Sequence, residues 1–114
     1  MGLAGFLQGL IIKLKLYFWR SIMPITKEQA IKDLRRIPGV GISIANDLWN
    51  IGIKSVAQLE GKDPHQLYDQ SNSYAGMVQD RCVLYVFQCA VYFAETREAE
   101  REPEKLKWWS WKYL

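Results

Sequence analysis

The apolar residues of this chain recur at helical intervals, and polar residues mark where the helices begin. Thr26 and Gln29 have the spacing of a capping box, which predicts a helix beginning there. Its inner face would be formed by Ala30, Ile31, Leu34 and Ile37. The same interval returns after Gly41 and predicts a second helix. The apolar positions of that helix are Ile44, Ala45, Leu48 and Trp49.

Residues 38–41, Pro-Gly-Val-Gly, connect these two predicted helices. Glycine tolerates positive φ and lets a ligand approach the backbone, and the first N–H groups of a helix have no intrahelical acceptor. Together with the helix dipole, such N–H groups form a site for a phosphate. The predicted nucleic-acid-binding residues are Gly39, Val40, Gly41 and Ile42, through their N–H groups, assisted by Ser43 and Lys54.

The alternative to a phosphate site is a plain pair of helices that only packs. Ser43 favours this alternative, because serine can bond a phosphate but brings no positive charge. Val40 has a role under both interpretations, since its side chain can fill the gap between the two helices. The intact pair of glycines favours contact with DNA.

A second helical pair is predicted after Gly52, with a capping box at Ser55 and Gln58. Gly61 can end its first helix, and the Asp63-Pro64 pair suits the start of the next. Residues 71–76 are typical of a loop. A long helix is predicted from about residue 79 to about residue 97, and it is apolar on almost every side, as buried helices are.

These elements predict an all-α fold: a tandem helix-hairpin-helix bundle of four to five helices with a long buried C-terminal helix. Residues 23–114 would form this domain, and residues 1–22 an atypical apolar extension. The extension has three interpretations: a helix at a membrane surface or on a partner, an extra packed helix, or leader sequence ahead of a natural start at Met23. A membrane surface is expected as a partner only through residues 1–22.

The net charge of +3 is unevenly distributed along the chain. Residues 27–62 carry six basic and four acidic side chains, whereas residues 63–114 carry six basic and eight acidic ones. This mild basicity predicts weak, salt-sensitive binding of DNA. Cys82 and Cys89 lie about 10.5 Å apart if one helix carries both, too far for a disulfide, and are expected to be buried and reduced in a cytoplasmic protein.

Chemistry other than binding finds little support in the sequence. The chain has a single histidine, His65, and lacks a close pair of cysteines, so neither a metal nor another cofactor is expected. No spacing joins a nucleophile to a base, which predicts that the protein is not an enzyme. The tail, residues 105–114, alternates lysine with tryptophan; these tryptophans could stack on unpaired bases, but packing over an apolar groove is the favoured interpretation.

Residues 37–49, 52–68, 80–94 and 103–112 resemble the pathogenicity-locus family of small bacterial proteins, also labelled mitomycin-resistance proteins. The resemblance extends over residues 27–112. Residues 80–94, which contain both cysteines, make it specific. It implies a helix-hairpin-helix fold and non-sequence-specific DNA binding, in DNA repair or resistance to DNA damage. The alternative is a protein-interaction or regulatory module that does not bind DNA directly.

Overall fold

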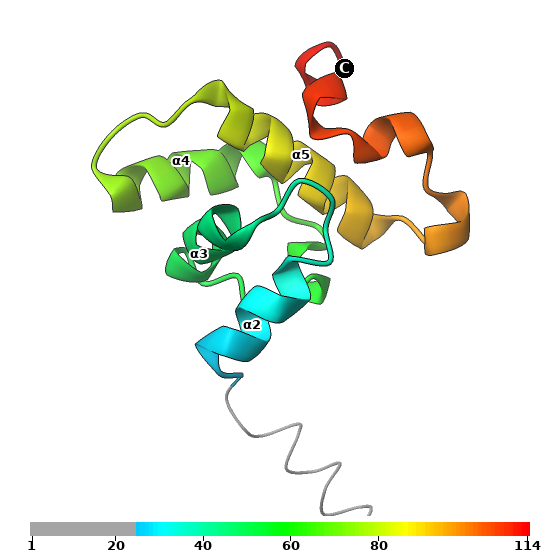
Figure 1. Ribbon diagram of the computed structural model, residues 1–114. Coiled ribbons are helices and arrows are strands. Elements are labelled where there is room, and N and C mark those ends of the chain that lie inside the picture. Colours follow the sequence, from blue (N-terminus) through cyan, green and yellow to red (C-terminus); the bar gives the residue numbers. More distant parts are fainter. Residues whose placement is uncertain (1–24) are drawn as a thin grey trace, which may run out of the picture.

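The computed structural model describes residues 25–114, so the interpretations of residues 1–22 lie outside it. The described chain forms four α-helices and no β-strand, which confirms the all-α prediction (Figure 1). They are α2 (Lys27–Leu34), α3 (Ile42–Asn50), α4 (Pro64–Ala75) and α5 (Arg81–Glu95). The short 3₁₀ helices are η1 (Ala57–Leu59), η2 (Glu98–Glu100), η3 (Pro103–Leu106) and η4 (Trp108–Lys112). Within residues 25–114, no helix is both long and apolar enough to cross a membrane.

Helix α2 begins at the predicted capping box. The Thr26 hydroxyl accepts a hydrogen bond from the N–H of Gln29, and the Gln29 side chain accepts one from the N–H of Thr26, both at 3.2 Å. Ala30 and Leu34 are fully buried on the inner face of the helix. The charged residues of α2 are therefore left on its outer face.

A tight turn leads from α2 into α3. The N–H of Val40 donates to the carbonyl of Ile37 at 3.1 Å, and Pro38 and Gly39 occupy the two central positions. Gly39 has φ +87°, the positive value that a type II turn requires at this position, and Pro38 is the residue common before it. Val40 is only 5% exposed and belongs to the same core cluster as Leu34 and Ala45, as its predicted filling role requires.

The predicted helix from Ser55 to Gly61 is much shorter than expected. It is the single 3₁₀ turn η1, because only five residues lie between Ser55 and the turn at Gly61. The Ser55 hydroxyl accepts from the N–H of Gln58 at 3.3 Å, as predicted, but the Gln58 side chain accepts from the N–H of Lys54 at 2.7 Å. The second predicted helical pair is thus the single turn η1 followed by helix α4.

Helix α4 starts at the predicted Asp63 cap but continues to Ala75, so the prediction of a loop over residues 71–76 was wrong. The polar side chains of this segment are used within the fold. Ser71 is buried and accepts from the side chain of Gln79 at 2.8 Å, and Asn72 accepts from the N–H of Gln79 at 2.9 Å. Gly76, with φ +71°, then ends the helix.

Helix α5 is the buried centre of the described fold, as predicted. It packs against α4, η1, η3 and η4, and Phe87, Cys89 and Ala90 are fully buried. Asp80 caps the helix by accepting from the N–H of Cys82 at 2.8 Å. The prediction that both cysteines are buried was wrong for Cys82, which is exposed because it lies in the first turn, before the buried part of the helix.

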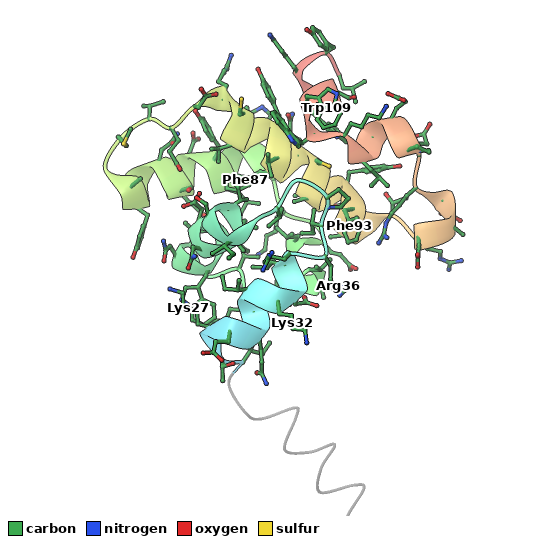
Figure 2. The ribbon with its side chains drawn as sticks, viewed as in Figure 1. Lys27, Lys32, Arg36, Phe87, Phe93 and Trp109 are labelled. Atoms are coloured by element: carbon green, nitrogen blue, oxygen red, sulfur yellow. The ribbon has the colours of Figure 1, made fainter. Side chains whose placement is uncertain are left out.

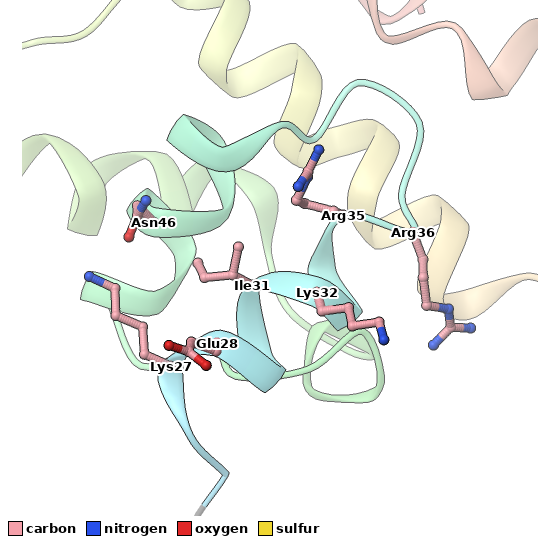
Figure 3. Close-up of a pocket in the computed structure, with 7 residues that line it drawn as sticks. All are labelled: Lys27, Glu28, Ile31, Lys32, Arg35, Arg36 and Asn46. Atoms are coloured by element: carbon pink, nitrogen blue, oxygen red, sulfur yellow. The ribbon is translucent and has the colours of Figure 1, made fainter.

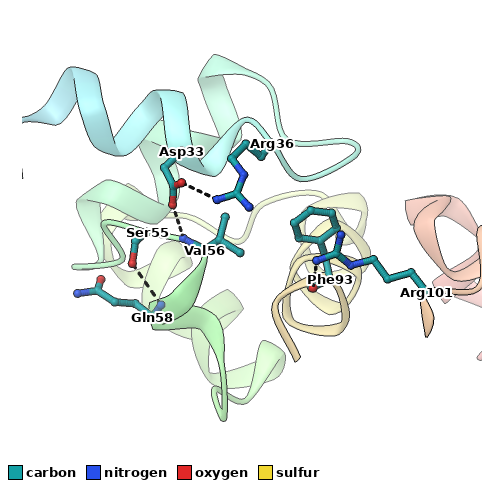
Figure 4. Close-up of polar contacts among 7 residues, drawn as sticks. All are labelled: Asp33, Arg36, Ser55, Val56, Gln58, Phe93 and Arg101. Carbon is teal, nitrogen blue, oxygen red and sulfur yellow. Dashed lines mark hydrogen bonds and ion pairs between the residues drawn. The ribbon is translucent and has the colours of Figure 1, made fainter. Parts of the chain in front are cut away.

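The segment after α5 folds back onto it through η2, η3 and η4. Arg101 closes the end of α5: its side chain donates to the carbonyls of Phe93 and Thr96, each at 3.0 Å, and its guanidinium lies 3.6 Å from the centre of the Phe93 ring (Figure 4). In the tail, Trp108 packs against the core cluster and Trp111 against Tyr92. This confirms the packing interpretation for these two tryptophans.

Candidate nucleic-acid interface

The start of α3 offers unpaired backbone donors. Gly41 is its N-cap and supplies no side-chain hydrogen bond to the helix. The first intrahelical bond runs from the N–H of Ala45 to the carbonyl of Gly41 at 3.0 Å. The N–H groups of Ile42, Ser43 and Ile44 therefore have no acceptor within the helix. Gly41 and Ser43 are exposed, and Ile42 is 58% exposed, so this end of α3 faces solvent.

The two glycines of the turn have different surroundings. A Cβ atom on Gly41 would meet no other atom within 4 Å, which leaves its backbone open to a ligand. A Cβ atom on Gly39 would lie 2.7 Å from Cδ1 of Trp108. The close approach that glycine permits at position 39 is thus made by the tail of the same chain. The N–H of Val40 is also occupied, because it donates to Ile37.

Lys54 is not close to the start of α3. Its ammonium lies 5.3 Å from the centre of the Trp49 ring, in the last turn of that helix. Ser43 and Trp49 are six residues apart on α3, which is about 9 Å along the helix axis. The structure therefore brings Gly39, Val40, Gly41, Ile42 and Ser43 together and leaves Lys54 apart from them.

A basic groove lies between α2 and α3, next to these donors. It is lined by Lys27, Glu28, Ile31, Lys32, Arg35, Arg36 and Asn46. Figure 3 shows Ile31 at its centre, with Lys27 and Asn46 on one side and Lys32 and Arg35 on the other. The Asn46 side chain donates to the carbonyl of Ile42 at 3.0 Å, so the groove is continuous with the first turn of α3.

Three positive charges of the groove have no ion-pair partner in the described chain. Of the four basic side chains that line it, only Arg36 forms an ion pair there, with Asp33 at 2.8 Å. Asp33 in turn accepts from the N–H of Val56 at 2.8 Å, so this carboxylate is engaged in holding the fold (Figure 4). Lys27, Lys32 and Arg35 are exposed, and Glu28 is the only acidic side chain of the lining.

Sequence reasoning missed this groove, although the sequence contains its signal. Residues 27, 28, 31, 32 and 35 follow the i, i+1, i+4, i+5, i+8 pattern of one helix face, next to the stripe of the buried Ala30 and Leu34. Summing charges over residues 27–62 gave only +2 and concealed the concentration of basic residues on that face. Figure 2 shows Lys27 and Lys32 on α2 and Arg36 just after its end, away from the C-terminal turn with Trp109.

No alternative chemistry emerges in the described residues. Residues 25–114 contain no cluster of three metal-ligating side chains. Burial raises the pKa of the Cys89 thiol to about 11, which leaves it protonated and unreactive near neutral pH. The carboxylate of Asp80 raises the pKa of the exposed Cys82 thiol as well, through a hydrogen bond. Neither thiol has the lowered pKa of a nucleophilic cysteine.

Comparison with known proteins gives the family of this chain. The profile of the pathogenicity locus family matches residues 27–113, which include all four described helices. The chain belongs to this family. It is also similar to mitomycin resistance protein McrB of Streptomyces lavendulae, with 35% identity over 77 residues that make up 68% of each protein. No solved structure matches the chain. The resemblance drawn from the sequence is thus confirmed.

Proposed function

We propose that this pathogenicity locus protein binds the sugar-phosphate backbone of DNA without reading its sequence. Helices α2 and α3 and the turn between them would act as a helix-hairpin-helix unit. The observation that carries this proposal is the groove of Lys27, Lys32 and Arg35, which Asn46 joins to the first turn of α3, where no side chain caps the helix. One phosphate would accept from the N–H groups of Ile42 and Ser43, and its neighbours would face the three cations.

The surroundings of the groove support weak binding of the backbone more than tight or specific binding. Only three cations without an ion-pair partner in the described chain line it. A phosphate at the start of α3 would be attracted only by the partial positive charge of the helix dipole. Three neutralised phosphates predict a slope of about −2.7 in a plot of log affinity against log salt concentration. Lys54 lies outside this set, so we propose no phosphate contact for it at the same site.

The test is the binding of a fluorescently labelled mixed-sequence duplex, measured by anisotropy over a range of salt concentrations. Wild type should bind at low salt with a slope near −3, and Arg35→Ala should reduce the magnitude of the slope by about one. Lys62→Ala is the matched control, because Lys62 is exposed, forms no ion pair with the described residues and does not line the groove. Equal losses for Arg35→Ala and Lys62→Ala would refute a localised site.

A second variant tests the backbone donors separately from the charges. Gly41→Val places a side chain in open space at φ −92°, which the fold accommodates, but this side chain would block the N–H groups that follow. Binding should be lost while far-UV circular dichroism and urea denaturation remain close to wild type. Undiminished binding by Gly41→Val would exclude the start of α3 from the interface.

The name of the relative supports a biological setting for this binding. That protein is called a mitomycin resistance protein, and we propose resistance to mitomycin as the process that the chain serves, by binding DNA and not by catalysis. The matching test is survival of a sensitive bacterium that produces wild type or Arg35→Ala in the presence of mitomycin. Protection by wild type alone is expected. Equal protection by both proteins would show that resistance does not depend on the basic groove.

A second candidate function is docking on a protein. Tyr74, Met77 and Val78 are large, exposed apolar residues where α4 gives way to α5. Exposed apolar patches of this kind mark interaction sites. Should no DNA be bound at any salt concentration, this surface becomes the leading candidate, and loss of a captured partner on Met77→Asp would support it.

A further inference from the structure

The C-terminal tail places an exposed tryptophan beside the turn of the proposed interface. Trp108 meets the backbone at Gly39, where a Cβ atom would lie 2.7 Å from its ring. The ring of Trp109 stands at 89° to that of Trp108, with the two ring centres 5.8 Å apart. Trp109 is 55% exposed. The turn that leaves α2, Trp108 and Trp109 therefore form a continuous surface.

Packing accounts for the other two tryptophans of the tail but not for Trp109. Trp108 is partly buried against the core cluster. Trp111 donates its indole N–H to the carbonyl of Lys105 at 2.9 Å and packs on Tyr92, with ring centres 5.7 Å apart. Trp109 donates no hydrogen bond to the described residues and lies outside the core cluster. Its edge contact with Trp108 restricts the ring, which lowers the entropy cost of placing a ligand against it.

We infer that Trp109 stacks on an unpaired base of a DNA strand whose backbone lies in the groove of Lys27, Lys32 and Arg35. This inference rests on the proposed function and names its substrate class: DNA with a single-stranded segment. A positively charged groove followed by an aromatic ring is the arrangement that holds single strands, since every base has a face that can stack. In an intact duplex the bases are stacked on each other, and Trp109 gains nothing.

The arrangement fits an extended strand better than a compact ligand. The groove runs along α2, the turn follows, and the tail with Trp109 lies beyond the turn (Figures 1 and 2). A strand would pass from Lys27 and Lys32 across Arg35 to the turn and then to Trp109. Single-strand sites on protein surfaces span about 4–16 nucleotides, which is enough to follow this path.

The test compares two labelled DNAs of the same length, an oligothymidine strand of about 12 nucleotides and a duplex, by anisotropy at low salt. Wild type should bind the single strand more tightly than the duplex. Trp109→Ala should weaken single-strand binding about tenfold and leave duplex binding unchanged, and Trp109→Phe should restore part of the loss. Tyr113→Ala is the matched control, because Tyr113 is an exposed aromatic residue of the same tail, 82% exposed.

The outcomes separate this inference from the function on which it rests. Duplex binding without a preference for single strands, or unchanged single-strand affinity in Trp109→Ala, would overturn the stacking role and leave the backbone site intact. Equal losses of Trp109→Ala on both DNAs, with unchanged urea denaturation, would overturn stacking too. If wild type binds neither DNA, the proposed function itself fails. Loss of single-strand affinity in Tyr113→Ala equal to that in Trp109→Ala would assign binding to the tail in general and refute the specific role.

Discussion

Replacing Gly39 by alanine tests whether the tail holds the turn between α2 and α3. Gly39 has φ +87°, and a left-handed conformation costs an L-residue about 1–2 kcal/mol. The new Cβ atom would also lie 2.7 Å from Cδ1 and 3.3 Å from Cγ of Trp108, whose ring is packed on the core. Overpacking of this kind adds about 1–3 kcal/mol. Gly39→Ala should therefore lower the free energy of unfolding by about 2–5 kcal/mol.

Two other glycines separate the contributions. Gly52 has a nearly identical φ of +91° but open space around its Cβ position, so Gly52→Ala reports the backbone cost alone, about 1–2 kcal/mol. Gly41 has φ −92° and open space, so Gly41→Ala should cost about 1 kcal/mol or less, through its position as N-cap. The expected order of destabilisation is Gly39, then Gly52, then Gly41.

The assay is equilibrium urea denaturation followed by far-UV circular dichroism, with the slope of the transition checked in every variant. A double-mutant cycle with Trp108→Ala completes the test. Without the indole, Gly39→Ala should cost no more than Gly52→Ala. Equal costs of Gly39→Ala and Gly52→Ala in the wild-type background would refute the tight contact, and so would a cost of Gly39→Ala that Trp108→Ala leaves unchanged.

Two further predictions concern the cysteines and the link between α2 and η1. Native protein should label rapidly only at Cys82, as counted by mass spectrometry, and a second fast thiol would contradict the burial of Cys89. Because burial raises the pKa of Cys89 from 9.0 to about 11, the unfolded state ionises first; stability should fall between about pH 9 and 11, less steeply in Cys89→Ala. Asp33→Ala should lower the free energy of unfolding by about 1.5–3 kcal/mol. Asp33→Asn should lower it less, because an amide oxygen still accepts from the N–H of Val56. Equal losses in the two variants would show that this hydrogen bond contributes nothing to stability.

The elements that the sequence predicted well are those whose determinants lie within a few residues. The capping box at Thr26 and the Asp63-Pro64 start of α4 are local, and both helices begin where these residues place them. The buried character of α5 follows from its composition, because a helix that is apolar on most sides has no stable place except the interior. The all-α class depended only on such features.

The predictions that failed depend on partners distant in the chain or on space. Ser71 and Asn72 looked like loop residues, yet Gln79 satisfies their side chains after the chain has reversed direction. The helix predicted from Ser55 had its cap but not its length, because the chain turns at Gly61. Cys82 has the same local pattern as Cys89, and only the packing of α5 against its neighbours distinguishes an exposed end from a buried middle.

The candidate interface shows the same division between local and tertiary information. The sequence identified the residues around Gly41, whose backbone remains open in the fold, but it could not distinguish Gly41 from Gly39. Both are glycines in one turn, and only the packing of Trp108, sixty-nine residues after Gly39, distinguishes them. Gly39 contacts the tail, whereas the backbone of Gly41 stays accessible to a ligand. The turn is therefore the point at which the stability of the tail and the proposed binding of DNA meet.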